Sequence, residues 1–156
     1  MSAQVPGPGA PVLVGMDGSE GSTAALGWAV AVAGATGAEV IAVHAAGLLA
    51  HLGDRTVPAQ AHRADLLAAL EGWVATGPAQ PAAAVRCRLV EGNPILGLLA
   101  AAAEEHAALI VVGRRGAGGY PGLELGSTSR ALAERAGVPV VIIPGSTTGP
   151  EAGTGR

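Results

Sequence analysis

Glycine and hydroxyl residues near the carboxyl end of the chain have the types and spacing needed to hold a phosphate group. Two residues separate Gly113 from Gly116, and after nine more residues the run Gly126–Ser129 (Gly-Ser-Thr-Ser) begins. Glycines let backbone N–H groups turn toward an anion and admit its close approach. A helix starting at Ser127 would add the partial positive charge of its N-terminus, and Ser127 and Ser129 would add hydroxyl donors. A chain with 25 glycines has glycine-rich loops for other reasons too, but this order of strand, motif and helix favours phosphate binding.

A second polar group, Asp17-Gly18-Ser19, follows the first apolar run of the chain. Asp17 is either a ligand contact or a turn and capping residue, and the residues alone leave both open. Arg114 and Arg115 lie inside the glycine motif and are either phosphate contacts or a solvated pair.

The residue types that are absent or scattered exclude several functions. All nine basic residues are Arg, which excludes a P-loop lysine, a Schiff base and the lysine of a receiver domain. The net charge is −3, and the aromatic residues are two Trp and one Tyr, so we expect no nucleic-acid partner. The four His residues lack metal-ligand spacing, and we expect no protein metal site.

Five short apolar runs alternate with longer helical patterns, which predicts the order βαβαβαβαβ. Most runs are continuously apolar, as strands of a parallel sheet covered on both faces are. Expected strands are Val12–Met16, Val40–His44, Val85–Val90, Leu109–Val112 and Pro139–Ile143. Expected helices run from a Ser19 cap to about Ala33, along the stripe Leu66–Val74, from the Asn93-Pro94 cap to about His106, and over Ser127–Arg135.

These elements predict an α/β fold with an open, doubly wound, five-stranded parallel sheet of Rossmann-like type in a single domain. Arg86 and Arg88 alternate with apolar residues, so their strand should lie near an edge of the sheet. Ligands of such sheets bind at the carboxyl ends of the strands, where strand order reverses. Asp17 follows the first strand and Gly113 the fourth, and the two motifs should therefore meet there.

The remaining sequence features concern the ends of the chain and its compartment. Residues 1–10 and 146–156 are rich in Gly and Pro or small polar residues and read as flexible ends around a domain at 11–145. No signal peptide is visible, and the uncharged stretch 21–38 is too poor in Val and Leu to insert well into a membrane. A single cysteine, Cys87, fits a reducing compartment and is expected to be buried and inert. We expect a cytoplasmic protein without a membrane partner.

The motif Gly113-x2-Gly116-x9-Gly126-Ser127 resembles the G-2x-G-9x-G-(S/T) signature of ATP-binding universal stress proteins. The resemblance extends to Val12-Leu-Val-Gly-Met-Asp-Gly-Ser, Val90-Glu-Gly-Asn-Pro and Pro139-Val-Val-Ile-Ile-Pro, and thus covers nearly all of the chain between its ends. It implies a fold like that of the adenine nucleotide α-hydrolases, with ATP as the ligand and with any Mg²⁺ carried mainly by the phosphates. It also implies a homodimer formed through the last strand.

Residue by residue, the resemblance assigns parts of a nucleotide site. It implies that Asp17 lies near ribose and adenine with Gly15 and Met16, and that the backbone of Ala45 reads the adenine edge. The residues implied beneath ribose and phosphates are Val112, Gly113, Arg114 and Gly116, and those implied to receive the phosphates are Gly126, Ser127, Thr128 and Ser129.

The expected function is that of a nucleotide-dependent sensor or regulator in the stress response. Fast phosphoryl transfer needs a metal-binding carboxylate and extra positive charge at the phosphates, and Glu124 is the only carboxylate expected there. We therefore expect no catalytic residues and at most slow hydrolysis. Two alternatives stay open: a slow ATPase or phosphotransferase on the same fold, and an interaction module that binds no nucleotide.

Overall fold

The structure is a computed structural model that describes residues 9–77, 85–114 and 125–144. Most of the amino-terminal end expected to be flexible, and all of the tail 146–156, lie outside the described residues.

A five-stranded parallel sheet forms the centre of the molecule, as the sequence predicts. Its strands are β1 (Val12–Gly15), β2 (Val40–Ala46), β5 (Val85–Glu91), β6 (Leu109–Gly113) and β7 (Val140–Ile143). They lie in the order β5-β2-β1-β6-β7, and every neighbouring pair is parallel. Strand order therefore reverses beside β1, since the chain goes first to β2 and β5 and then to β6 and β7 on the other side.

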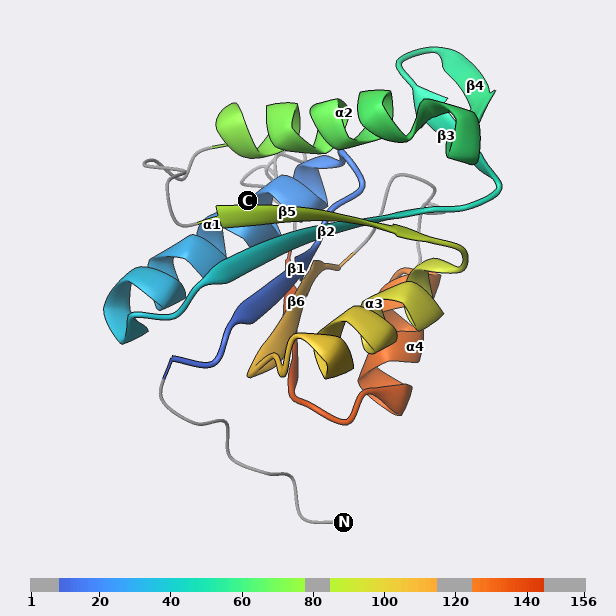
Figure 1. Ribbon diagram of the computed structural model, residues 1–156. Helices are drawn as coiled ribbons and strands as arrows, with labels where there is room; N and C mark the ends of the chain where they lie inside the picture. Colours follow the sequence, from blue (N-terminus) through green and yellow to red (C-terminus); the bar gives the residue numbers. More distant parts are fainter. Residues whose placement is uncertain (1–8, 78–84, 115–124, 145–156) are drawn as a thin grey trace, which may run out of the picture.

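Helices cover both faces of this sheet (Figure 1). On one face lie α1 (Glu20–Thr36) and α2 (Arg63–Ala75), and on the other α3 (Pro94–Glu104) and α4 (Ser127–Arg135). Alternate residues of β1 face opposite layers: Val14 packs toward α1 and α2, and Leu13 toward α3 and α4. Burial of each such side chain stabilises the fold by about 1.5–3 kcal/mol. Among the described residues, no helix combines the length and apolar character needed to cross a bilayer.

Two helix starts carry the caps that the sequence predicts. Ser19 Oγ accepts the N–H of Ser22 at 3.2 Å at the start of α1. Asn93 Oδ1 accepts the N–H groups of Ile95 and Leu96 at 2.9 and 3.2 Å at the start of α3. Both caps lie at the carboxyl end of the sheet and fix where these helices begin.

A β-hairpin between β2 and α2 is a feature that our reading of the sequence missed. It consists of β3 (Leu49–Leu52) and β4 (Arg55–Pro58), followed by the short 3₁₀ helix η1 (Ala59–His62). The hairpin turns at Gly53-Asp54, and Gly53 has a φ of 63°. A Gly-Asp pair between two four-residue segments is a recognised hairpin signal, but neither segment has the long apolar run of the central strands.

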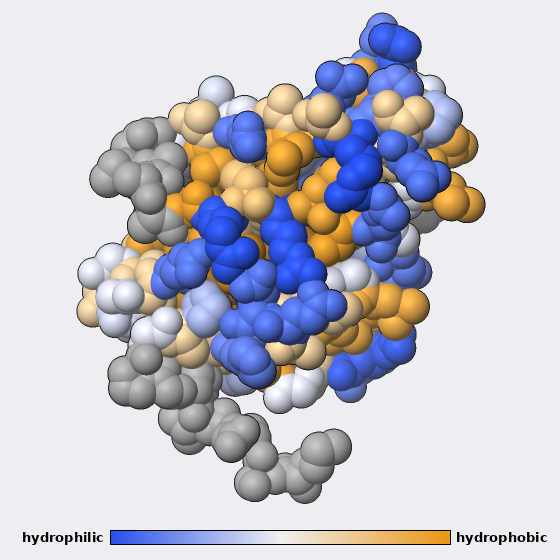
Figure 2. Space-filling model, in the orientation of Figure 1, coloured by the Kyte–Doolittle hydropathy of each residue, from blue (hydrophilic) through white to orange (hydrophobic). Residues whose placement is uncertain are grey.

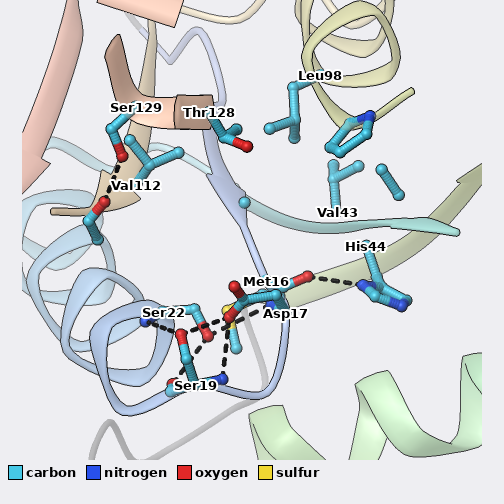
Figure 3. Close-up of a pocket in the computed structure, with 14 residues that line it drawn as sticks. Met16, Asp17, Ser19, Ser22, Val43, His44, Leu98, Val112, Thr128 and Ser129 are labelled. Carbon is cyan, nitrogen blue, oxygen red and sulfur yellow. Dashed lines mark hydrogen bonds between the residues drawn. The ribbon is translucent and has the colours of Figure 1, made fainter. Parts of the chain in front are cut away.

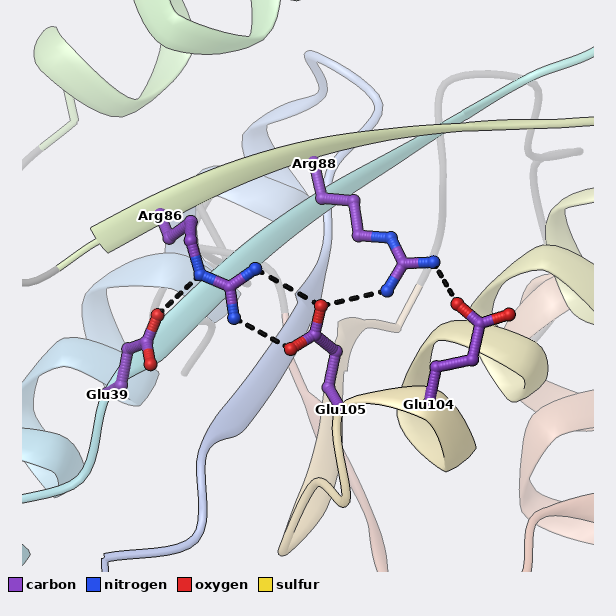
Figure 4. Close-up of polar contacts among 5 residues, drawn as sticks. All are labelled: Glu39, Arg86, Arg88, Glu104 and Glu105. Atoms are coloured by element: carbon purple, nitrogen blue, oxygen red, sulfur yellow. Dashed lines mark hydrogen bonds and ion pairs between the residues drawn. The ribbon is translucent and has the colours of Figure 1, made fainter.

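Strand β5 is an edge strand, as its alternating arginines predict, and its α3-side face is held by ion pairs (Figure 4). The Glu105 carboxylate accepts two bonds from Arg86 at 2.7 and 3.1 Å and one from Arg88 at 2.8 Å. Arg86 also bonds Glu39 at 2.7 Å, and Arg88 pairs with Glu104. The view in Figure 2 shows hydrophilic side chains gathered below β5 and around the end of α3.

Candidate functional site

A cavity of about 150 Å³ lies at the carboxyl end of the sheet, where strand order reverses (Figure 3). It is lined by the ends of β1, β2 and β6 and by the starts of α1, α3 and α4. Because β1 stops at Gly15 while its neighbours β2 and β6 continue, the cavity opens between those two neighbours. The two motifs that the sequence singled out therefore face one space.

The backbone of β2 presents a peptide group to this cavity at Ala45. The N–H of Met16 bonds the carbonyl of Val43 at 2.8 Å, so the peptide groups of Val43 point toward β1. Strand alternation directs the N–H and C=O of Ala45 to the same side. Since β1 has ended at that level, these groups face the cavity that Ala45 lines.

The floor and far wall next to Ala45 are apolar. Val43, Leu98 and Val112 line the cavity with Pro94, the first residue of α3. A Cβ on Gly15 would lie 3.1 Å from Val112 and 3.2 Å from Leu98, so glycine there keeps the floor open. A narrow apolar slot with one exposed peptide edge suits a flat heteroaromatic ring.

Asp17 takes the turn role that the sequence left open, at the rim of the same cavity. One carboxylate oxygen accepts the N–H of Ser19 at 2.9 Å and also the Ser19 hydroxyl. Ser22, buried in the first turn of α1, donates its hydroxyl to the Ser19 carbonyl at 3.0 Å. Asp17, Ser19 and Ser22 all line the cavity, so this hydrogen-bonded turn forms a polar wall.

The start of α4 forms the opposite end of the cavity. Its N-cap is Gly126, which offers no side-chain acceptor, in contrast to Ser19 and Asn93 at α1 and α3. Thr128 and Ser129 from the first turn line the cavity. An uncapped helix N-terminus directs N–H groups and partial positive charge toward an anion.

One expected hydroxyl donor at this helix is already engaged. Ser129 is buried, and its hydroxyl donates to the carbonyl of Gly113 at 2.6 Å. The proton of Ser129 thus ties α4 to the end of β6. A contact of the Ser129 hydroxyl with a phosphate stays a prediction, and it would have to replace or share this bond to Gly113.

Packing against α1 requires a glycine at position 113. A Cβ built on it would lie 2.6 Å from the backbone carbon of Gly21 in α1 and 2.7 Å from its oxygen. The end of β6 therefore touches the first turn of α1 backbone to backbone, and no other residue type fits there without displacing one of them.

Eight of the twelve residues proposed for the site line this cavity. They are Gly15, Met16, Asp17, Ala45, Val112, Gly113, Thr128 and Ser129. Arg114, Gly126 and Ser127 adjoin it without lining it, and the N–H of Gly126 donates to the Arg114 carbonyl at 2.8 Å. Gly116 and Glu124 lie outside the described residues.

Six further lining residues are not among the twelve proposed for the site. They are Ser19, Ser22, Val43, His44, Pro94 and Leu98. The ring nitrogen Nδ1 of His44 lies 2.8 Å from the Met16 carbonyl, and because a carbonyl only accepts, Nδ1 carries the proton. The only sequence signal for His44 is its place at the end of a strand.

Among the described residues, those outside the cavity offer little further chemistry. Cys87, expected to be buried, is only partly buried. This partial burial, with Glu71 nearby, raises the pKa of the thiol, so the unreactive thiol form dominates at neutral pH. The described parts of the chain contain no group of three or more His, Cys, Asp or Glu residues placed to hold a metal ion.

A family model and similar curated proteins identify the same protein family. The universal stress protein family matches residues 10–144. A universal stress protein of Mycobacterium tuberculosis is 39% identical over 142 residues, covering 85% of this chain and 45% of that protein. One of Mycolicibacterium smegmatis is 34% identical over 137 residues with the same coverage. The chain spans about half the length of these mycobacterial relatives.

Solved structures show the same fold. A universal stress protein in complex with cAMP is 28% identical, with a TM-score of 0.59, covering 85% of this chain and 94% of that one. The protein UspA from Lactobacillus plantarum, 23% identical, has a TM-score of 0.65 and covers 88% of this chain and 99% of its own. A universal stress protein of Archaeoglobus fulgidus in complex with dAMP has a TM-score of 0.59 at 23% identity, covering 85% and 96%.

Proposed function

The chain belongs to the universal stress protein family, and from that premise we propose that its cavity binds an adenine nucleotide, with ATP as the ligand. The observation that carries the proposal is the pairing of two features at opposite ends of one cavity. One end has an apolar slot edged by the Ala45 peptide, and the other has the uncapped start of α4.

Each feature matches one part of the nucleotide. Adenine is flat and carries hydrogen-bonding groups on its edge, which the N–H and C=O of Ala45 can meet while Val43 and Leu98 contact its faces. The phosphates are anions, which the first-turn N–H groups of α4 can bind. Structures of relatives in complex with cAMP and dAMP support an adenine ligand.

The residues at the phosphate end fit a nucleotide that brings its own metal ion. The described first turn of α4 offers N–H groups and hydroxyls, which bind phosphate oxygens rather than a cation. Any Mg²⁺ would be held mainly by the phosphates. We propose that the nucleotide state regulates a partner in the stress response and that the protein acts in the cytoplasm.

The direct test is calorimetry of the native protein with ATP and magnesium, together with chromatography of any nucleotide released on denaturation. Gly126→Val should weaken ATP binding at least about tenfold, because the added side chain would occupy the space over the first-turn N–H groups. Gly126 has a φ of −69°, which valine also adopts, so far-UV circular dichroism and cooperative melting should persist.

Gly137→Val is the matched control, because Gly137 is exposed beyond the far end of α4 with nothing within 4 Å of an added Cβ. Equal ATP affinity in the Gly126 and Gly137 variants would show that the phosphate site is misplaced. If the native protein shows no heat of binding with ATP, and ATP does not raise its melting temperature, the chain is an interaction module instead. If the native protein converts ATP to a product, and Glu124→Gln or Asp17→Asn abolishes that conversion, the chain is an enzyme.

We also propose a homodimer formed through β7. This strand lies at one edge of the sheet, and its residues Val140, Val141, Ile142 and Ile143 are all apolar and partly exposed. The opposite edge strand, β5, carries Arg86, Arg88 and Glu91 instead. An uncharged edge pairs with another strand more readily than a charged one.

A further inference from the structure

The loop that forms the polar wall of the cavity rests on a tryptophan from a distant helix. The indole of Trp73 on α2 lies against one side of Gly18, which has a φ of 80° and stays exposed on its other side. A Cβ on Gly18 would lie 2.8 Å from Cζ2 of the indole and 2.9 Å from Cε2. The indole therefore contacts the loop where Gly18 lacks a side chain, between Asp17 and Ser19.

His44 joins the same loop to the same tryptophan. Its Nδ1 donates to the Met16 carbonyl at 2.8 Å, and its ring meets the Trp73 ring edge to face, with centroids 5.2 Å apart and planes at 89°. The N–H of Met16 is held by Val43. The residues on both sides of Asp17 are thus held, Met16 by β2 and Gly18 by α2.

We propose that Trp73 is a positioning residue of the ligand site, holding Met16–Ser19 in the conformation that presents Asp17 and Ser19 to the ligand. Trp73 does not line the cavity itself, and it acts through Gly18 and His44. The inference rests on the proposed nucleotide site.

The contacts of Trp73 with Gly18 and His44 give it a role beyond filling space in the core. The chain has two Trp, one Tyr and no Phe, and the buried residues of α2 are Leu66, Leu70 and Val74. The fully buried side chains of α2 are thus aliphatic, while Trp73, the aromatic residue of this helix, is half-buried and packs against the same core as well as against the loop. Leucine at that position could pack, but its side chain is shorter than indole and lacks a ring for His44.

The first test compares ATP affinity by calorimetry in Trp73→Phe and Trp28→Phe. Phenylalanine keeps an aromatic ring but lacks the indole edge of Nε1, Cε2 and Cζ2 that contacts Gly18. We expect Trp73→Phe to bind ATP about fivefold to tenfold more weakly than the native protein, and Trp28→Phe to bind as the native protein does. Trp28 is a matched control, since it lies on α1, is 37% exposed and does not line the cavity.

The second test uses Trp28→Phe as a protein with Trp73 as its single tryptophan. With excitation at 295 nm, ATP should change the emission of Trp73, while Trp28 alone, in Trp73→Phe, should give no change. If Trp73→Phe melts cooperatively, its ATP affinity relative to that of the native protein decides the proposal. If it does not, the effect of ATP on the Trp73 emission of Trp28→Phe decides it.

The outcomes separate this inference from the proposed function. If calorimetry of the native protein with ATP detects no heat of binding, both the nucleotide site and the role of Trp73 are overturned. ATP binding by the native protein with equal affinity in both Trp variants overturns the positioning role alone. The same holds if Trp73→Phe fails to fold and ATP leaves the Trp73 emission unchanged.

Discussion

At the scale of single residues, Gly113 shows how one position serves the packing and the cavity at once. It lines the cavity, its carbonyl accepts the Ser129 hydroxyl, and its Cα faces the backbone of Gly21. These contacts bring the end of β6, the start of α1 and the start of α4 together. The shape of the site therefore depends on the lack of a side chain at Gly113.

Gly113→Ala should destabilise the protein by about 3 kcal/mol, because its Cβ would overlap backbone atoms of Gly21, which cannot rotate away. Gly34→Ala is the control, since Gly34 lies exposed near the end of α1 with nothing within 4 Å, and it should raise stability by about 0.5–1 kcal/mol. Urea denaturation measures both. Equal stability of the two variants would contradict the close contact between β6 and α1.

At the scale of elements, β5 combines apolar packing with a cluster of charged side chains on one face. Arg86 and Arg88 lie on its α3-side face and bind Glu39, Glu104 and Glu105 from the loop before β2 and the end of α3. Hydrogen bonds from Arg86, and then from Arg88, lower the pKa of Glu105 to about 2. The ionised carboxylate is therefore the form that holds this edge.

Glu105→Gln should lower stability at pH 7 by about 1 kcal/mol, a modest effect because both arginine partners of Glu105 are partly exposed to solvent. A lowered pKa contributes stability that is present above the ordinary Glu value and is lost as pH falls toward 2. The stability gap between native protein and variant should therefore narrow below about pH 4.5. Urea titrations at pH 7 and pH 3 measure it, with exposed Glu134→Gln as control, and a constant gap would contradict the ion pairs.

The parts of the fold predicted from sequence are those governed by burial on two faces. Val12–Val14 and Leu109–Val112 are continuously apolar because helices cover both sides of their strands. The β3–β4 hairpin depends instead on the local conformation of Gly53. Its strands are short and alternate between exposed and buried residues, so the sequence shows no long apolar run there.

The features of the candidate site also divide into those that the sequence predicts and those that it does not. The glycine motif and Asp17 could be located from residue type and from their place after two strands. The donation from Ser129 to Gly113, and that from His44 to Met16, depend on how segments 16 and 28 residues apart meet. No local pattern carries such contacts, because they are set by the packing of β2 and α4 against the rest of the molecule.

At the scale of the whole molecule, the two edges of the sheet differ in what they offer another chain. Carbonyls of Pro139 and Ile143 accept the N–H groups of Ile110 on β6 and of Arg114, which directly follows β6. By strand alternation, Val141 also faces β6, and the peptide groups of Val140 and Ile142 point away from the sheet. The outer edge of β7 can therefore pair with β7 of a second copy without changing the fold of either.

Ile142→Pro should convert a homodimer into a folded monomer. Proline removes the N–H of Ile142, which points away from β6, and it is tolerated on an edge strand because the ladder to β6 stays complete. Ile142→Val keeps that N–H and should remain dimeric. Light scattering after size-exclusion chromatography measures the mass of each variant. A monomeric native protein would contradict the proposed dimer, and a dimeric Ile142→Pro variant would place the interface on a surface other than β7.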